Sequence, residues 1–429
     1  MVTSAPPGAA EALIRFIDRS PSPFHAVAEA AHLLDAAGFT AVDGAGTWPA
    51  GGRHYLVRDG SLVAWAVPDG APAATPFRLV GAHTDSPNLR IKPRPDTGRA
   101  GWRQLGVEVY GGALLNSWLD RDLGLSGRVA LRSGETRLVL VDRPVLRVPQ
   151  LAIHLDRNVN DGGLVLNKQV HMTPVWGLGQ PSRDGFAGFL ADELDVPTGD
   201  VVAWDVMVHD VTPGALIGVD QELIASGRLD NLCSSWAGVV ALADVASTGA
   251  VQTHVPVVCL FDHEEVGSTT ATGAAGELLP HVLERIVLAR GGGRDDYLRS
   301  LAGSACASAD MAHATHPNYS ERHDPEHPIA CNAGPVIKVN ANARYATDAA
   351  GAALFERACD AAGVPVQRFV SRSDMPCGST IGPLTAGRLG IPTVDVGVAQ
   401  LGMHSAREVC GADDPAMFTA SLAAFLRAA

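Results

Sequence analysis

The sequence has few basic residues, no long hydrophobic run and no leader-like start, and each shortage excludes a class of protein. Lys and Arg number 33 against 46 Asp and Glu, which gives a formal net charge of −13. Nucleic acids and anionic membranes attract clustered Lys and Arg, so we expect neither as a partner. No apolar run reaches the ~18–20 residues that a membrane span needs. The first residues lack a basic stretch followed by an apolar one, so we expect no secretory signal.

Cysteine is scarce, and its spacing shows no pairing. The seven cysteines are an odd number, scattered along the chain with no C-x-x-C pair. This pattern predicts reduced thiols packed in the core of a cytoplasmic protein. Cys377 follows Met375 and Pro376 and precedes a glycine. A catalytic thiol is one interpretation there, but a small packed residue in a tight turn is favoured.

The balance of the remaining residues is that of a folded protein with two lobes. Hydrophobic residues make up 46% of the chain and charged residues 18%, which excludes broad disorder. A chain of 429 residues is long for one compact core, so we predict more than one. Residues 95–222 have short strand-like runs with frequent Gly and Pro, which predicts an inserted β-rich domain. Residues 1–94 and 223–429 then form one α/β domain in two parts.

Strand-like and helical patterns alternate after residue 223, which predicts a mixed or parallel sheet flanked by helices. Near the start, residues 8–38 are predicted as two helices, because Ser22 and Pro23 suit a cap followed by a first turn. Residues 53–67 are predicted as a hairpin. The later predicted helices are 231–247, 277–290, 347–361, 380–389 and 413–428. The predicted strands of the insert are 107–110, 127–131, 136–141 and 201–208.

Adjacent carboxylates follow the apolar run 255–261. That run has the length and composition of a buried strand, and the sequence Asp262-His-Glu264-Glu265 comes directly after it. Open α/β sheets place their sites at the carboxyl ends of strands, and adjacent side chains on an extended chain point in different directions. One glutamate can therefore bind a metal while the other faces the substrate as a base. The alternative is a solvated loop after a strand.

Four other segments also lead to His or Asp. His83 ends an apolar run, and Asp85 two residues later is suited to orient its imidazole. Asp230 precedes a helical pattern, where it suits either a helix cap or a metal ligand. Asp310 ends a strand of small residues, and His404 follows another predicted strand.

Each of these residues by itself is more often a cap or a hydrogen-bonded polar residue than a ligand. Five such residues in one chain are unlikely to be five unrelated caps or hydrogen-bonded residues. Imidazoles and carboxylates without thiolates favour an open catalytic site for zinc, manganese or cobalt over a closed structural zinc site. Two imidazoles and three carboxylates can hold two metal ions about 3.5–4 Å apart if one carboxylate bridges them. The set is His83, Asp230, Glu265, Asp310 and His404.

Eight segments of the chain carry longer motifs around these residues. They are 81–93 (GAHTDSPNLRIKP), 226–231 (SGRLDN), 262–268 (DHEEVGS), 308–313 (SADMAH), 316–319 (HPNY), 334–340 (GPVIKVN), 376–383 (PCGSTIGP) and 403–408 (MHSARE). In these motifs and their order the chain resembles the aspartyl aminopeptidases, relatives of vacuolar aminopeptidase I, over nearly its whole length. The resemblance implies a zinc-peptidase-like α/β catalytic domain with a helix-flanked mixed sheet and an inserted β-rich dimerisation domain.

The resemblance also implies a role for each matching residue. The implied ligands are His83 and Asp310 for one metal, Glu265 and His404 for the other, and Asp230 as the bridge. Glu264 is implied as the general base, and Asp85 as the residue that orients His83. The implied substrate contacts are His313 at the tetrahedral intermediate, Lys338 and Tyr345 at an acidic side chain, and His154 from a neighbouring subunit. For Lys338 the alternative is a solvated lysine at the end of a strand.

A member of that family would bind two divalent ions per subunit, Zn²⁺ with Mn²⁺ or Co²⁺ as alternatives. It would cleave peptides that have a free N-terminus, and it would assemble as dimers that join into a tetrahedral dodecamer. We therefore predict a metallo-aminopeptidase that releases N-terminal Asp or Glu, in which Glu264 moves the proton from water to the leaving amine. The alternatives are broader or neutral specificity, a carboxypeptidase or deacylase on the same scaffold, and, least favoured, a non-enzymatic cargo or scaffold protein.

Overall fold

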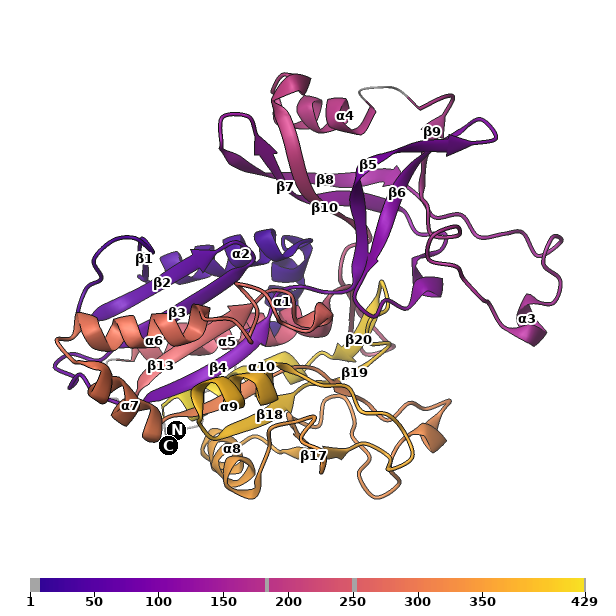
Figure 1. Cartoon of the computed structure of the whole chain (residues 1–429). Coiled ribbons are helices and arrows are strands. Elements are labelled where there is room, and N and C mark those ends of the chain that lie inside the picture. Colours follow the sequence, from indigo (N-terminus) through magenta and orange to yellow (C-terminus); the bar gives the residue numbers. More distant parts are fainter. Residues whose placement is uncertain (1–7, 182–184, 249–252, 428–429) are drawn as a thin grey trace. The chain divides into compact units, whose positions relative to one another are not determined.

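The computed structural model of the chain describes residues 8–181, 185–248 and 253–427 (Figure 1). The chain divides into two compact units. The first comprises the chain up to Asp85, Gly214–Met403 and the chain from Glu408 onward, and the second comprises Ser86–Pro213 and His404–Arg407. The long segment of the second unit starts and ends nine residues earlier than the predicted insert (86 against 95, and 213 against 222). The reason at its start is that β5 (Asn88–Arg99) already pairs within the sheet of the second unit.

A nine-stranded mixed sheet organises the first unit. Its four central strands run parallel, and antiparallel strands flank them on both sides. The strand order is β1 (Thr40–Ala41), β2 (Gly52–Arg58), β3 (Ser61–Val67), β13 (Val255–Phe261), β4 (Phe77–His83), β14 (Ala305–Ala309), β18 (Thr393–Gly397), β16 (Val336–Val339), β17 (Gln367–Val370). A smaller sheet has the order β11 (Ala215–Ile217), β12 (Leu223–Ser226), β20 (Glu408–Gly411), β19 (Ala399–Leu401), β15 (Ala312–His313).

Helices cover both faces of the large sheet because its central strands are apolar on both sides. Along β4, Val80 and Ala82 belong to one buried cluster, whereas Phe77 and Leu79 belong to another. A strand buried on both faces reads in the sequence as a continuous apolar run. The first cluster takes side chains from α1 (Ala9–Asp18), α2 (Pro23–Ala36), α5 (Leu229–Ser247), α8 (Ala349–Ala362) and α10 (Asp414–Leu426). The second takes them from α6 (Leu278–Ala289), α7 (Arg294–Ala302) and α9 (Ile381–Leu389).

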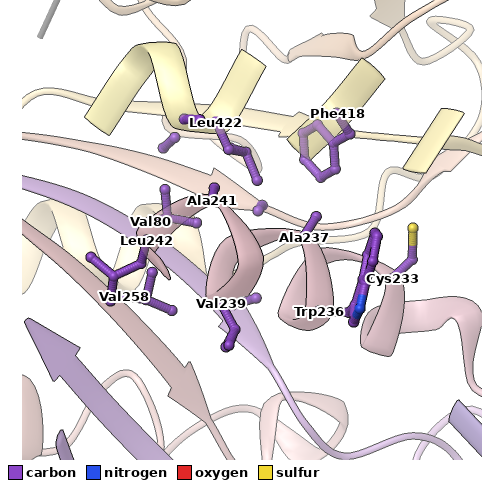
Figure 2. Packing of buried hydrophobic residues seen from close by; sticks show 14 of the residues in the cluster. Val80, Cys233, Trp236, Ala237, Val239, Ala241, Leu242, Val258, Phe418 and Leu422 are labelled. Carbon is purple, nitrogen blue, oxygen red and sulfur yellow. The ribbon is translucent and has the colours of Figure 1, made fainter. Parts of the chain in front are cut away.

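Helix α5 lies between the sheet and α10 (Figure 2). Gly238 lets this helix approach the strands closely, because a Cβ at that position would be 3.3 Å from Val80 and 3.6 Å from Val258. Figure 2 shows Phe418 and Leu422 of α10 on the other side of the helix. Packing on two sides fixes the position of α5, and with it the first turn of the helix, which carries one of the predicted ligands.

The second unit is built on an antiparallel six-stranded sheet. The strand order is β8 (Thr136–Leu146), β7 (Leu123–Leu131), β10 (Val201–Asp210), β5, β6 (Trp102–Tyr110), β9 (Val175–Leu178). Helix α4 (Gly185–Leu194) buries Phe186 and Leu190 in the apolar cluster of this unit. The use of this unit in dimerisation stays a prediction. Within the described part of the chain, no helix is both long and apolar enough to cross a membrane.

The predicted fold class, an α/β protein with a helix-flanked mixed sheet and a β-rich second part, is confirmed. The two N-terminal helices are confirmed, and Ser22 caps α2 by accepting a hydrogen bond from the His25 amide at 3.4 Å. The hairpin is confirmed as β2 and β3, and the later helices as α5, α6, α8, α9 and α10. Residue 428 of the last predicted helix lies outside the described residues. The seven cysteines are free thiols, as predicted, and five of them are buried.

Three helices of the described residues were not predicted: α3 (Val159–Gly162), α4 and α7. Helix α3 has only four residues, too few to give a periodic pattern. Helix α7 is short and rich in charged residues, and it buries only Tyr297 and Ser300, so it lacks the apolar periodicity that identifies a helix. Helix α4 lies in the insert predicted to be β-rich, between the predicted strands 136–141 and 201–208. Its aromatic residues Phe186 and Phe189 are of a type enriched in strands.

Gly127 tests the packing of the second sheet. A Cβ at this buried position would be 2.0 Å from the carbonyl oxygen of Asp205, and its φ is 150°. We expect Gly127→Ala to lower the free energy of unfolding by about 3 kcal/mol, from strain and a steric clash together. The matched control is Gly134→Ala, which has a φ of 88° and no neighbour within 4 Å, and should cost about 1 kcal/mol. Urea unfolding would measure both, and equal losses would contradict the packing described here.

Candidate metal centre

Parallel strands end side by side at one edge of the large sheet. Phe261 of β13 is in register with His83 of β4, and Ser308 of β14 is in register with Gly81 of β4. The residues that follow β13 and β14, Asp310 among them, therefore emerge beside His83. This carboxyl edge is where open α/β sheets place their sites.

The chain turns sharply after β13. His263 has a left-handed φ of 66°, and a short 3₁₀ turn (Glu264–Val266) follows it. The backbone amides of Glu264 and Glu265 donate hydrogen bonds to the two carboxylate oxygens of Asp85, at 3.0 and 3.1 Å. The extended backbone predicted for the two glutamates is therefore wrong. Two consecutive amides can meet one carboxylate only if the chain curls around it.

Asp85 also lies against His83. The Nδ1 atom of His83 is 3.0 Å from the backbone oxygen of Asp85 and 3.6 Å from its carboxylate. The Nε2 atom faces two other carboxylates, 3.4 Å from Oδ1 of Asp230 and 3.7 Å from Oδ1 of Asp310. The hydroxyl of Ser235 donates to the backbone oxygen of His83 at 2.8 Å. The imidazole is thus fixed on one side and points its other nitrogen at a pair of carboxylates.

These side chains form a buried, electrostatically strained cluster. His83, Asp230 and Asp310 are 1%, 4% and 8% exposed. Burial by itself would lower the pKa of His83, but hydrogen bonds with Asp230, Asp310 and Asp85 raise that pKa well above its usual 6.5. The same carboxylates that favour a proton on His83 would favour a metal ion in its place, because a ligating imidazole is neutral.

Glu264 is the half-buried carboxylate at the margin of this cluster. Burial raises the pKa of Glu264 to about 7, with the negative charges of Asp310, Asp85 and Asp230 adding to the rise and His83 opposing it. A carboxylate with a pKa near neutrality can both accept and release a proton at physiological pH. Its environment suits a residue that carries a proton between two partners.

The donor atoms have the spacing that a metal ion requires. One ligand atom from each of His83, Asp230 and Asp310 lies within 4.8 Å of the others, and the same holds for His83, Glu264 and Glu265. Asp230 and Glu265 also have carboxylate oxygens within 4.8 Å of each other. Concentrating carboxylates in a buried site is costly unless a cation neutralises them. Imidazole and carboxylate donors without thiolate fit zinc, manganese or cobalt.

Asp230 is held by a contact that no local sequence pattern predicts. The residue at the N-cap of α5 is Arg228, and the backbone of Asp230 is not helical, with φ −82° and ψ 103°. The Asp230 amide donates a hydrogen bond to the carboxylate of Glu408 at 3.0 Å, and Glu408 is 2% exposed. The position of Glu408 in the motif 403–408 could have identified it as a site residue, but no local sequence pattern indicates that it is buried.

Lys338 is buried, so the alternative of a solvated lysine is wrong. It is 1% exposed, and its ammonium nitrogen lies 3.5 Å from the carboxylate of Asp310 and donates to the Met311 carbonyl at 3.1 Å. The ring of Tyr345 lies 5.1 Å from the same nitrogen. Burial, with the adjacent Cys377, raises the pKa of Tyr345. Lys338 thus adjoins the candidate ligand Asp310, and Tyr345 lies beside Lys338.

Three predicted site residues remain, and two of them, His313 and His154, are not among the grouped donor atoms of the described residues. His313 is exposed on β15, with its ring 6.1 Å from that of Phe369. His404 belongs to the second unit, where its Nδ1 lies 3.1 Å from the carbonyl oxygen of Gly112. His154 is an exposed residue of the same unit. The roles of these three residues stay predictions.

Comparison with known proteins identifies relatives along nearly the whole chain. The model of the family described as aminopeptidase I zinc metalloprotease (M18) matches residues 16–426. A probable M18 family aminopeptidase 2 of Streptomyces coelicolor is 59% identical over 422 residues, 98% of each chain. The structure is similar to that of Ape4 in its complex with Nbr1, with a TM-score of 0.94, 35% identity and coverage of 98% of this chain and 85% of the other. It is also similar to the S. cerevisiae mApe1 dodecamer, with a TM-score of 0.84, 29% identity and 97% coverage of both chains.

Asp230 provides the test of metal binding. We expect Asp230→Asn to weaken zinc binding about 100-fold, because it removes charge at the centre of the donor set. The measurement is zinc content after dialysis against a chelator buffer, by elemental analysis. Asp414→Asn is the matched control, since Asp414 is a buried aspartate of α10 outside the donor set, and it should keep wild-type zinc. Equal zinc retention by both variants would exclude Asp230 as a ligand.

Proposed function

The chain belongs to the aminopeptidase I zinc metalloprotease (M18) family, and we propose that it is a dinuclear aminopeptidase that releases acidic residues from the N-termini of peptides. The observation that carries this proposal is the buried cluster of His83, Asp230 and Asp310 beside Glu264. It combines metal-ligand chemistry with a carboxylate whose pKa is near neutral. Membership of the family makes the chain a metallo-aminopeptidase; the two ions, their ligands and the acidic preference are our inference.

The proposed ligand set divides between two ions. His83 and Asp310 would hold the first, Glu265 and His404 the second, and Asp230 would bridge them. Zn²⁺ is the expected ion, given the family, with Mn²⁺ and Co²⁺ as alternatives with similar ligand preferences. Divalent ions bound here would supply Lewis acidity and lower the pKa of a water molecule.

The reaction then depends on proton transfer by Glu264. Its carboxylate takes a proton from water as the oxygen attacks the first peptide carbonyl, and returns that proton to the leaving amine. Asp85 keeps the Glu264 backbone in place through the 3.0 Å hydrogen bond to its amide. His313 is proposed to donate a hydrogen bond to the carbonyl oxygen as negative charge develops on it.

The proposed preference for acidic N-terminal residues rests on Lys338 and Tyr345. An ammonium group in a buried position attracts a carboxylate more strongly than one in water does. In the structure that ammonium group lies 3.5 Å from the carboxylate of Asp310. An acidic substrate would approach the same charge from the side of Tyr345, whose ring lies 5.1 Å away.

We also propose that the chain is a cytoplasmic homo-oligomer, in which dimers formed through the second unit join into a tetrahedral dodecamer. Support comes from the similar S. cerevisiae mApe1, which is described as a dodecamer. The exposed His154 would complete the site of a neighbouring subunit. An enclosed assembly would admit peptides and exclude folded proteins.

Substitution of the base tests the reaction. We expect Glu264→Gln to lower kcat about 10³-fold, because glutamine has the same shape but cannot carry the proton. Release of Asp, Glu and Leu from peptides with free and blocked N-termini would be measured alongside zinc content. Zinc should be retained, which separates loss of the base from loss of a ligand, and Glu11→Gln on the exposed side of α1 should be fully active. Cleavage of blocked substrates would instead favour a carboxypeptidase or deacylase, and faster release of Leu a broader specificity.

The proposed role of His154 is tested by complementation. His154→Ala should lower kcat while leaving the oligomer, measured by light scattering, unchanged. Co-expression of His154→Ala with Glu264→Gln should restore activity, because mixed oligomers contain sites that combine an intact Glu264 with a neighbour's His154. Activity that stays at the sum of the two separate variants would show that His154 acts within its own subunit or not at all.

A further inference from the structure

Another buried carboxylate, Asp395, lies in the first unit outside the proposed ligand set. Asp395 is 0% exposed, on strand β18 beside β14. Its Oδ1 accepts a hydrogen bond from the Thr380 hydroxyl and its Oδ2 accepts one from the Ala346 amide, each at 2.5 Å. Its own amide donates to the Thr347 hydroxyl at 2.9 Å. A single residue of the sheet therefore binds two different loops.

The N-terminus of α9 is shaped around this carboxylate. Thr380 caps the helix by accepting a hydrogen bond from the Gly382 amide at 3.1 Å. A Cβ on Gly382 would lie 2.3 Å from Oδ2 of Asp395, so a residue with a side chain could not occupy that position. The first turn of a helix carries partial positive charge, which favours an anion there. Burial raises the pKa of Asp395, while the positive charge of Lys338 and the hydrogen bonds from Thr380 and Ala346 oppose that rise.

One of the two loops that Asp395 binds carries Tyr345, which is proposed to recognise the N-terminal side chain together with Lys338 of β16. Tyr345 directly precedes Ala346, whose amide is bound by the carboxylate. The preceding residue, Arg344, joins the loops, because its guanidinium donates to the Cys377 carbonyl at 3.3 Å and its carbonyl accepts from the Ser379 hydroxyl at 3.2 Å. Displacing either loop from Asp395 would therefore move Tyr345 relative to Lys338.

We propose that Asp395 is the positioning residue of the specificity pocket, holding Tyr345 and attracting Lys338 without touching the substrate. This inference rests on the function proposed above, because it assigns Lys338 and Tyr345 to recognition of the N-terminal residue. The simpler alternative is that Asp395 only stabilises the fold. The two differ in what a substitution does to substrate preference.

Asp395→Asn is the variant that separates these two explanations. Asparagine keeps the shape and can still accept from the Ala346 amide, while its amino group can donate to the Thr380 hydroxyl. The variant should therefore fold, but it lacks the negative charge and the second acceptor. We expect the preference for the favoured N-terminal residue, measured as a ratio of kcat/KM values for Asp and Leu substrates, to shrink about tenfold. The change should appear mainly in the KM of the favoured substrate.

The control variant is Asp414→Asn, another buried aspartate of the first unit, which should keep the wild-type ratio. If the wild type prefers Leu over Asp, the proposed acidic specificity fails. A smaller preference for Leu in Asp395→Asn would still support the positioning role of Asp395. A ratio within about twofold of wild type, with both substrates slowed alike, would overturn the proposal in favour of a purely structural role.

A thiol provides a readout that needs no activity. Cys377 lies against the Tyr345 hydroxyl and is partly exposed, as is Cys331, which is bonded instead to the Ala399 carbonyl. In Asp395→Asn we expect Cys377 to be alkylated by iodoacetamide about tenfold faster, because the asparagine amino group cannot accept from the Thr380 hydroxyl and the loop that carries Cys377 is held less firmly. The rate at Cys331 should not change. Mass spectrometry would follow both residues. Unchanged rates at Cys377 would contradict the positioning role even if the protein proved to be inactive on every peptide.

Discussion

The site depends on an electrostatic constraint. Several carboxylates lie close together in a buried position, and they require a positive charge among them. His83, Asp230 and Asp310 are almost inaccessible to water, and the pKa of His83 is raised by the carboxylates around it. Carboxylates brought this close repel one another strongly when water is excluded. The arrangement persists because packing and hydrogen bonds hold each side chain where it is, which prepares the site for cations.

The sheet and its hydrogen bonds supply that rigidity. Parallel strands β4, β13 and β14 bring their carboxyl ends to one edge, and α5 is wedged between the sheet and α10. Asp85 then joins two of the strand ends, because its carboxylate binds the amides of Glu264 and Glu265 while it also contacts His83. The carboxylate of Glu408 likewise holds the backbone of Asp230, by accepting a hydrogen bond from its amide. The proposed ligands and the proposed base are thus parts of one hydrogen-bonded frame.

Two buried charges outside the proposed ligand set are also stabilised by neighbouring groups. Lys338 is buried against Asp310, and Asp395 is buried against the first turn of α9, with Thr380 and Ala346 as donors. Lys338 thus has a partner of opposite sign, and Asp395 has a set of hydrogen-bond donors, as burial of a charge requires. The proposed metal binding by Asp310 and the proposed substrate recognition by Lys338 would therefore be coupled through this ion pair. A change at one of them should be felt at the other.

The sequence by itself determined the α/β class, most of the helices and the identity of the residues gathered at the site, because apolar runs and the motifs after them are local signals. The local sequence pattern could not predict the 3₁₀ turn at Glu264, because that turn is held by a hydrogen bond to the Asp85 carboxylate, 179 residues away in the chain. It also could not predict the burial of Lys338, Glu408 and Asp395, or the start of the second unit at Ser86. Only the tertiary structure decided these, because burial and long-range hydrogen bonds exist only once distant segments have packed together.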